Sequence, residues 1–323
     1  MMKSLSIYQD FVESAIAAYH LPETPNNLYE PITYFLGLGG KRMRPVLALM
    51  SAELFGAQFE SAKNAALTVE LFHNFTLIHD DIMDEAPLRR GRETVHKKWS
   101  ENIGILSGDA LLIEAYKALS NHSPEQLAQL LPVFNQTATE VCEGQQWDMD
   151  FETMEKVEID AYIKMIAYKT AVLLGCSLKM GAIVAGASES DANDLYEFGV
   201  NLGIAFQIQD DILDVYADQN KFGKQVGGDI IANKKTFLLL KAIEDADATQ
   251  SQELNTLSTE QDYELKIKKT KAIYAALDIK AKATKKMNEF HTKAMENLDH
   301  IGIADEKKTP MRELATFLLG REH

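Results

Sequence analysis

The segment Ile78-His79-Asp80-Asp81-Ile82-Met83-Asp84 places three aspartates in an otherwise apolar run, and Ile208-Gln209-Asp210-Asp211-Ile212-Leu213-Asp214 repeats both the aspartate spacing and the apolar positions. Carboxylates four residues apart lie on one face of a helix, so the first and last aspartates of each cluster project together. Desolvating an unpaired carboxylate costs several kcal/mol, so such groups take up protons or pair with cations. Two clusters that face each other therefore predict a site for several divalent metal ions.

The ligand chemistry indicates which metal such a site prefers. Oxygen ligands without an accompanying Cys or His cluster favour a hard cation, and Mg²⁺ keeps water and substrate phosphate among its ligands. A phosphate-bearing substrate is therefore implied. The alternative is that each cluster is a solvated helix face, the usual fate of a single such motif. The matched apolar neighbours of the two clusters favour the metal site over this alternative.

The apolar residues around both clusters recur at helical intervals, and no row of short alternating strands is present. The clearest helical runs cover residues 65–82, 111–119, 161–184 and 194–215. Residues 171–187 are apolar on most sides, which predicts a central helix wrapped by others. No linker rich in Pro, Gly or Ser divides the chain, so residues 1–323 are expected to form one all-α domain, with 244–262 as its most loop-like stretch.

The formal net charge of −15 disfavours nucleic acid and anionic lipid as main partners, because both require a positive surface. The amino terminus does not resemble a signal peptide, and no uninterrupted apolar stretch resembles a membrane span. We therefore expect a cytoplasmic protein without an integral membrane segment. The only cysteines, Cys142 and Cys176, form neither a disulfide framework nor a metal-binding spacing, and we assign them to packing.

Three groups of basic residues stand out against the negative background. Gly39-Gly40-Lys41-Arg42-Met43-Arg44-Pro45 combines glycines, which allow close backbone approach, with guanidinium groups that bind phosphate oxygens in pairs. Arg89-Arg90-Gly91-Arg92 follows the first aspartate cluster. A third group follows the second cluster: Lys221, Lys224, Lys234 and Lys235. These residues predict diphosphate binding; the alternatives are exposed side chains at the start of a helix and ion pairs to Asp84 and Glu85.

Taken in order, these motifs resemble the trans-isoprenyl diphosphate synthases, also called the polyprenyl synthetase family. The resemblance spans almost the whole chain. It rests on Gly40 to Pro45, the first aspartate cluster, Arg89-Arg90-Gly91, Lys169-Thr170, Phe206 to Asp214, Gly223-Lys224, and Asp229 to Lys234. It implies a helical bundle with a central catalytic cavity, in which isopentenyl diphosphate is condensed head-to-tail with an allylic diphosphate.

The resemblance also implies a role for each matching residue. The expected metal ligands for Mg²⁺, three ions per site, are Asp80, Asp81, Asp84, Asp210 and Asp214, with Asp211 assisting. Lys169, Arg89, Lys224 and Lys234 would hold the allylic diphosphate, and Lys41, Arg44, His73 and Arg90 that of isopentenyl diphosphate. Thr170 and Gln207 would lie near the allylic cation. The metals would draw charge from the departing diphosphate.

The residues just before the first cluster predict the product length. In the family they form the floor of the tunnel that holds the growing prenyl chain, and here they are Phe75 and Thr76. One aromatic residue at the fifth upstream position and none at the fourth is typical of geranylgeranyl (C20) synthases, whereas aromatics at both favour farnesyl (C15) products. We expect a C20 or C15 product from a dimethylallyl, geranyl or farnesyl primer.

Three other functions compete with this interpretation. A class I terpene cyclase shares the bundle and the first cluster but has no need of a second diphosphate site. A non-catalytic subunit of a heteromeric prenyl synthase commonly lacks one or both clusters. A metal-storage bundle leaves the arginines and lysines without a purpose. A homodimer is expected from the family and from the prevalence of two-fold oligomers.

Overall fold

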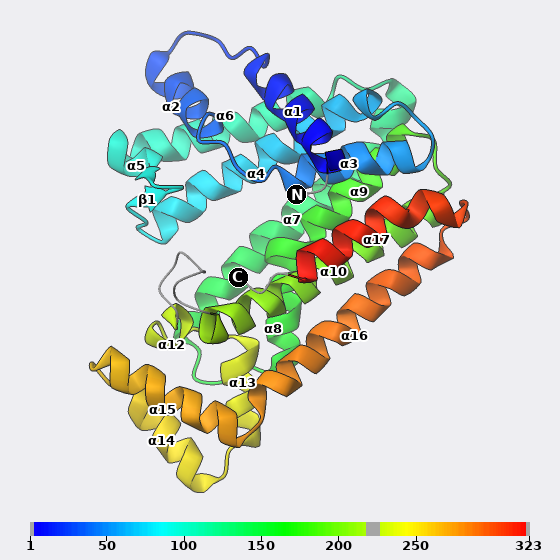
Figure 1. The fold of residues 1–323 in the computed structure, drawn as a ribbon. Helices are drawn as coiled ribbons and strands as arrows, with labels where there is room; N and C mark the ends of the chain where they lie inside the picture. Colours follow the sequence, from blue (N-terminus) through cyan, green and yellow to red (C-terminus); the bar gives the residue numbers. More distant parts are fainter. Residues whose placement is uncertain (1–2, 218–226, 321–323) are drawn as a thin grey trace. The chain divides into compact units, whose positions relative to one another are not determined.

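The computed structural model describes residues 3–217 and 227–320 (Figure 1). The described residues are almost entirely helical, with one short hairpin, so the predicted all-α fold is confirmed. The chain divides into two compact units, Met1–Asn135 with Cys176–Asn193 and Gln136–Gly175 with Asp194–His323. We call them unit 1 and unit 2. The single domain expected for residues 1–323 stays a prediction.

Unit 1 is built around the helix that carries the first aspartate cluster. Its elements are α1 (Lys3–Ala17), α2 (Asn26–Leu36), α3 (Met43–Leu54), η1 (Phe59–Ala62), α4 (Lys63–Met83), β1 (Leu88–Arg89), β2 (Arg92–Glu93), α5 (Val95–Lys98), α6 (Glu101–Leu119) and the start of α7 (Pro124–Thr153). Residues of α9 (Val172–Val184) from Cys176 onward also belong to it. Along α4 the side chains at 65–72 are all buried, so this helix is central to the unit.

Small residues allow the helices of unit 1 to approach closely. A methyl group at Gly108 of α6 would lie 2.3 Å from Nε2 of His79 on α4, and one at Gly181 of α9 would lie 2.1 Å from the carbonyl oxygen of Ala48 on α3. A larger residue at Gly181 would push α9 away from the backbone of α3, whereas one at Gly108 would displace the His79 side chain. The packing of α9 on α3, and the position of the His79 side chain next to the first aspartate cluster, therefore depend on these glycines.

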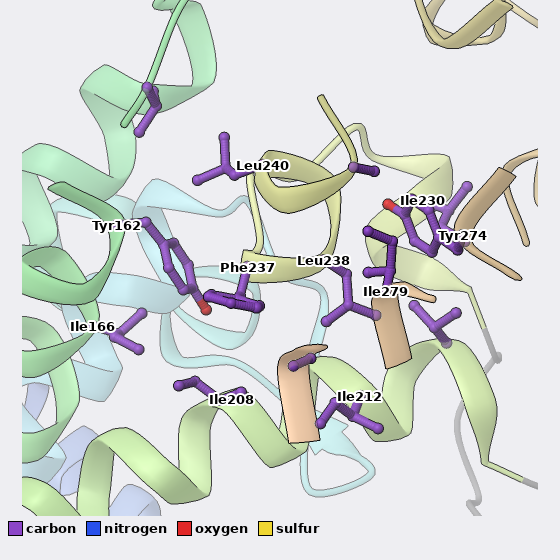
Figure 2. Close-up of a cluster of buried hydrophobic side chains, with 14 of the residues drawn as sticks. Tyr162, Ile166, Ile208, Ile212, Ile230, Phe237, Leu238, Leu240, Tyr274 and Ile279 are labelled. Atoms are coloured by element: carbon purple, nitrogen blue, oxygen red, sulfur yellow. The ribbon is translucent and has the colours of Figure 1, made fainter. Parts of the chain in front are cut away.

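Unit 2 contains the second aspartate cluster. Its elements are the rest of α7, α8 (Ile159–Ile166), the π-helical turn η2 (Ala167–Ala171), α10 (Glu189–Tyr216) from Asp194 onward, α12 (Gly228–Ile231), α13 (Phe237–Asp245), α14 (Ala248–Ser258), α15 (Tyr263–Ala276), α16 (Ile279–His300) and α17 (Asp305–Leu319). Figure 2 shows its core, where Tyr162 of α8, Ile208 of α10 and Phe237 of α13 converge. This core fixes the helix that carries Asp210, Asp211 and Asp214.

Two sequence predictions are wrong. Residues 244–262 are not mainly loop, because α14 occupies most of the stretch; its first turn is closed by a capping box in which Asp247 and Gln250 satisfy each other's backbone N–H groups. Cys176 is buried as expected, but Cys142 is exposed and does not contribute to packing.

Among the described residues, one continuous helical stretch, Ile159–Val184, is long and apolar enough to cross a membrane. In its most apolar window, 72% is buried within the protein. Central helices of folded domains have the same property, and the sequence analysis expected residues 171–187 to be such a helix.

Candidate active site

The first aspartate cluster lies at the C-terminal end of α4. The backbone N–H of Asp84 donates to the carbonyl of Asp80 (2.8 Å), so the helical geometry extends to the last aspartate of the cluster. Asp80 is half-buried and Asp84 is exposed, whereas Asp81 is only 1% exposed. Two carboxylates of the cluster thus lie at the surface of the unit, and the middle one points inward.

A two-residue hairpin places Arg89 against that inward aspartate. Strands β1 and β2 are joined by Arg90 and Gly91, both with positive φ (54° and 76°), which suits the twist of a tight hairpin. The Arg89 guanidinium donates from Nε to both oxygens of Asp81 (2.8 and 2.9 Å), and Nη2 lies 2.7 Å from Oδ1. Arg89 therefore pairs with Asp81 rather than with Asp84 or Glu85, and the metal role of Asp81 stays a prediction.

The glycine-rich turn before α3 lies against the next arginine. A methyl group at Gly40, whose φ is 149°, would lie 2.8 Å from Nη2 of Arg90. Only glycine combines this backbone conformation with such a close approach. The turn that precedes Lys41 therefore lies against the Arg90 guanidinium, and a shared anion site of Lys41 and Arg90 stays a prediction.

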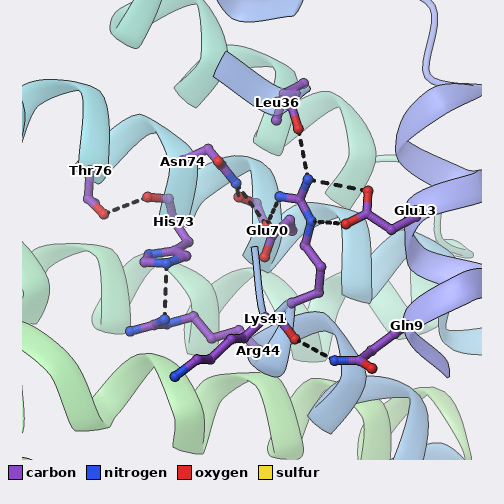
Figure 3. Close-up of polar contacts among 10 residues, drawn as sticks. Gln9, Glu13, Leu36, Lys41, Arg44, Glu70, His73, Asn74 and Thr76 are labelled. Carbon is purple, nitrogen blue, oxygen red and sulfur yellow. Dashed lines mark hydrogen bonds and ion pairs between the residues drawn. The ribbon is translucent and has the colours of Figure 1, made fainter. Parts of the chain in front are cut away.

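The side chains of Arg44, on α3, and His73, on α4, contact each other in unit 1 (Figure 3). Arg44 Nη1 lies 3.0 Å from His73 Nε2, while the buried Nε of Arg44 has no hydrogen-bond partner within the described residues. Burial lowers the pKa of Arg44 to about 10. Burial, reinforced by Arg44 and Arg90, lowers the pKa of His73 well below 6.5, so its imidazole is neutral and accepts the Arg44 N–H. An incompletely satisfied guanidinium among further cations indicates a binding place for an anion.

A buried network that the sequence motifs did not indicate supports this pair. Arg42, only 4% exposed, donates from Nη1 to Glu70 (2.6 Å), from Nε to Glu13 (2.8 Å) and from Nη2 to the Leu36 carbonyl (2.7 Å). Asn74 donates to the same Glu70 oxygen (2.9 Å). Glu70 is the only charged residue in the apolar run of residues 65–72. A buried carboxylate in such a run requires a cation nearby, so Glu70 could have predicted a buried partner such as Arg42. The network anchors the start of α3, two residues before Arg44.

The second aspartate cluster also has an inward middle residue. Asp211 is 4% exposed and accepts from the Tyr162 hydroxyl and from the Phe237 N–H (3.3 Å). Burial raises the pKa of Asp211 to about 7, although the hydrogen bond from Tyr162 opposes the shift. Asp211 thus links α10 to α8 and α13. Asp210 and Asp214, like their counterparts in the first cluster, are more exposed.

Asp214 connects the cluster to the lysines that follow it. Its Oδ2 accepts from the Asp229 N–H (3.0 Å), and its carbonyl accepts from Gly227 (2.7 Å), so α12 begins directly on α10. Lys234 follows on the exposed turn after α12, and its N–H donates to the Asp229 carbonyl (2.9 Å). Lys224 lies outside the described residues, as does Lys221.

Lys169 and Thr170 lie in η2, a π-helical turn, and such turns occur frequently at functional sites. The backbone N of Lys169 would be 2.2 Å from a methyl group at Gly144, so α7 touches the turn at this glycine. Lys169 Nζ forms an ion pair with Asp148 Oδ2 (2.6 Å), so the carboxylate of Asp148 compensates the charge of this partly buried lysine. No motif in the sequence had indicated Asp148. Gln207 is half-buried on α10, one turn before Asp211.

The predicted tunnel-floor residues lie on α4. The Phe75 ring contacts those of Phe72 and His79, with centroids 5.6 and 4.8 Å away, and it is half-buried. The Thr76 hydroxyl donates to the His73 carbonyl (2.8 Å). Their role in product length stays a prediction.

Within the described part of the chain, no three His, Cys, Asp or Glu groups come close enough to form a closed metal site. The candidate residues fall into two groups. Unit 1 brings together Lys41, Arg44, His73, Asp80, Asp81, Asp84, Arg89 and Arg90; unit 2 holds Lys169, Thr170, Gln207, Asp210, Asp211, Asp214 and Lys234.

The sequence profile of the Polyprenyl synthetase family matches residues 25–302. The chain belongs to this family. It is 38% identical to a geranylgeranyl pyrophosphate synthase from Geoglobus acetivorans, over 93% of each chain, and 44% identical to a geranylgeranyl diphosphate synthase from Methanosarcina mazei, over 69% and 70%. A crystal structure of a geranylgeranyl pyrophosphate synthase superposes with a TM-score of 0.91 at 44% identity, over 100% of this polyprenyl synthetase and 99% of that chain.

Proposed function

We propose that this polyprenyl synthetase makes geranylgeranyl diphosphate, condensing isopentenyl diphosphate head-to-tail with an allylic diphosphate. The observation that carries the proposal is the basic cluster of unit 1, in which Arg44 pairs with His73, Arg90 lies against Gly40, and Asp80 is near enough to Arg44 to affect its pKa. A cyclase that ionises one substrate needs one diphosphate site. The anion site at Arg44 supports a second diphosphate, and therefore a condensation.

The chemistry of the donors fits Mg²⁺. Each cluster offers two carboxylates at or near the surface, one helical turn apart, while its middle aspartate is held by a protein partner: Arg89 for Asp81, and Tyr162 for Asp211. We propose three ions per active site, with the outer carboxylates of each cluster as ligands. When bound, such ions stabilise the negative charge on the departing diphosphate as Lewis acids.

The chain's own residues would then bind and orient the substrates. The neutral His73 keeps the Arg44 guanidinium turned toward the diphosphate of isopentenyl diphosphate, and Lys41 and Arg90 complete that site. Lys169, Arg89, Lys224 and Lys234 would hold the allylic diphosphate; Lys169 would exchange Asp148, and Arg89 would exchange Asp81, for phosphate oxygens. The hydroxyl of Thr170 and the amide oxygen of Gln207 would face the allylic cation as dipoles, because a fixed dipole stabilises charge as it develops.

A product assay tests the proposed function. Purified protein is incubated with Mg²⁺, isopentenyl diphosphate and dimethylallyl, geranyl or farnesyl diphosphate, and dephosphorylated products are separated by length. We expect C20 as the main product. A main product above C25 would contradict the tunnel-floor role of Phe75. A cyclic hydrocarbon would indicate a terpene cyclase, and activity only after adding a partner chain would indicate a regulatory subunit.

We further propose a cytoplasmic homodimer. An exposed apolar face on α6 supports the dimer, since Ile105, Leu106 and Ile113 are 39%, 59% and 55% exposed on a helix that is otherwise packed against α4. Exposed apolar side chains that gather on one helix face are typical of interfaces.

A further inference from the structure

Unit 2 contains a cavity of about 290 Å³ that involves neither aspartate cluster directly. One wall is the ridge of α15 formed by Lys266, Thr270 and Tyr274, which are spaced four residues apart and so lie above one another. Their exposed fractions are 3%, 5% and 2%. Three polar side chains, each more than nine-tenths buried, therefore line the same cavity.

The hydrogen-bonding capacity of this ridge is largely unused. The Lys266 ammonium makes one hydrogen bond, to the Ile231 carbonyl (3.0 Å), and within residues 3–217 and 227–320 it has no carboxylate at ion-pair distance. In the same part of the chain, the hydroxyls of Thr270 and Tyr274 have no hydrogen-bond partner. Burial lowers the pKa of Lys266. These donors line the cavity and are not used up within the protein, so they can donate hydrogen bonds to an acceptor that is bound there.

The remaining surfaces of the cavity indicate what kind of acceptor fits. Leu239, Leu254 and Leu257 form an apolar wall, and Ile243 is 53% exposed. The carboxylates of Glu152, Glu155 and Asp229 also line the cavity and balance the charges of Lys234, Lys235 and Lys266, so the lining has no excess of positive charge that would favour a diphosphate. The combination favours a singly charged headgroup with a short apolar chain.

We infer that this cavity binds a small amphipathic monoanion, a carboxylate or a sulfate monoester with a short alkyl or alkenyl chain, whose headgroup accepts hydrogen bonds from Lys266, Thr270 and Tyr274. The lining also contains Asp229 and Lys234. Because the N–H of Asp229 donates to the Asp214 carboxylate, an occupant contacts the segment that joins the second aspartate cluster to Lys234. On the basis of the proposed function, the ligand acts as an effector of allylic diphosphate binding.

Calorimetric titration of the full-length protein tests the binding. The probes are hexanoate and hexyl sulfate, which distinguish the two headgroups, and hexan-1-ol, which lacks the charge. We expect at least one anion to bind, with affinity reduced about tenfold by Lys266→Met and about threefold by Tyr274→Phe, in line with a charged and a neutral hydrogen bond. Lys268→Met is the matched control, because Lys268 is exposed on the same helix, and it should leave affinity unchanged.

Three results would overturn the site: neither anion binds, hexan-1-ol binds as tightly as the anions, or Lys266→Met binds like the wild type. If Lys266→Met does not fold, as judged by circular dichroism, Tyr274→Phe and Thr270→Val carry the comparison. The coupling is measured separately, as a change of about threefold or more in KM for the allylic diphosphate when the probe is saturating. An unchanged KM would refute the coupling. Binding in a chain that shows no prenyl transfer would refute the proposed function and leave the site intact.

Discussion

At the scale of single residues, the two aspartate clusters follow the same plan. In each, the outer carboxylates lie at or near the surface while the middle one is buried and held by a neighbour: Asp81 by Arg89, and Asp211 by Tyr162. The sequence shows which aspartates share a helix face but not which of them is turned inward. That choice depends on Arg89 and Tyr162, which lie on other elements.

Arg42 should support substrate binding without touching the substrate. Arg42→Met leaves Glu70 buried without its cation, so the free energy of unfolding should fall by about 3 kcal/mol, and KM for isopentenyl diphosphate should rise because the start of α3 loosens. Urea unfolding and steady-state kinetics measure the two effects. Lys97→Met, which alters an exposed cation on α5, is the control.

The double variant Arg42→Met/Glu70→Leu separates the contribution of the Arg42–Glu70 ion pair from that of the packing of the two side chains. Replacing both charges with apolar side chains should restore most of the stability lost in Arg42→Met. The network would have no supporting role if Arg42→Met matched the control in both stability and KM.

The neutral state of His73 predicts a pH dependence of stability. Its pKa is lower in the folded than in the unfolded protein, where it is near 6.5, so the unfolded state binds the proton more tightly. The contribution of His73 is present above pH 6.5 and is lost as the pH falls below that value, at a rate of up to about 1.4 kcal/mol per pH unit. His73→Gln cannot take up this proton.

Thermal unfolding between pH 7.5 and 5.0 therefore measures the difference between the two proteins. The wild type should lose more stability over this range than His73→Gln. Parallel curves would show that His73 is not held neutral.

At the scale of elements, the π-helical turn η2 is the part most dependent on a neighbouring helix. Gly144→Ala places a methyl group 2.2 Å from the Lys169 backbone N, so α7 and η2 must separate and Lys169 must shift. We expect stability to fall by about 1–3 kcal/mol and kcat to fall with it. Gln146→Ala, on the exposed side of α7, is the control, and equal effects of the two variants would contradict the contact.

The helical periods around the aspartate clusters, around residues 111–119 and through 161–184 correctly predicted α4, α6, α8, α9 and α10, because their apolar faces are buried. The stretch 244–262 was misjudged because its composition is polar, although Asp247 and Gln250 have the spacing of a capping box. The hairpin was missed because its strands are only two residues long and show no alternating pattern, and the π turn was missed because it depends on contact with α7, which is distant in sequence. In the site, the cations were identified from their pattern, but the partners Glu70, Asp148 and Tyr162 were not.

At the scale of the whole molecule, the exposed face of α6 predicts how two copies associate. Leu106→Glu and Ile113→Glu place charges at the centre of this face and should convert a dimer into monomers, as measured by light scattering coupled to size-exclusion chromatography. Ile7→Glu alters an equally exposed apolar residue (58%) on α1 and is the control. A wild-type monomer, or a dimer that tolerates both α6 variants, would refute this interface.

Two adjacent lysines lie in opposite chemical situations. The Lys235 ammonium donates to the carbonyls of Phe151, Glu152 and Met154, where it closes the C-terminal end of α7, while Lys234 is exposed. An acylating reagent should therefore label Lys234 much faster than Lys235, and mass spectrometry of the digested protein can measure both rates. If an allylic diphosphate slows the labelling of Lys234 alone, the ratio of the two labelling rates reports how much of the protein has substrate bound, with Lys235 as the internal standard.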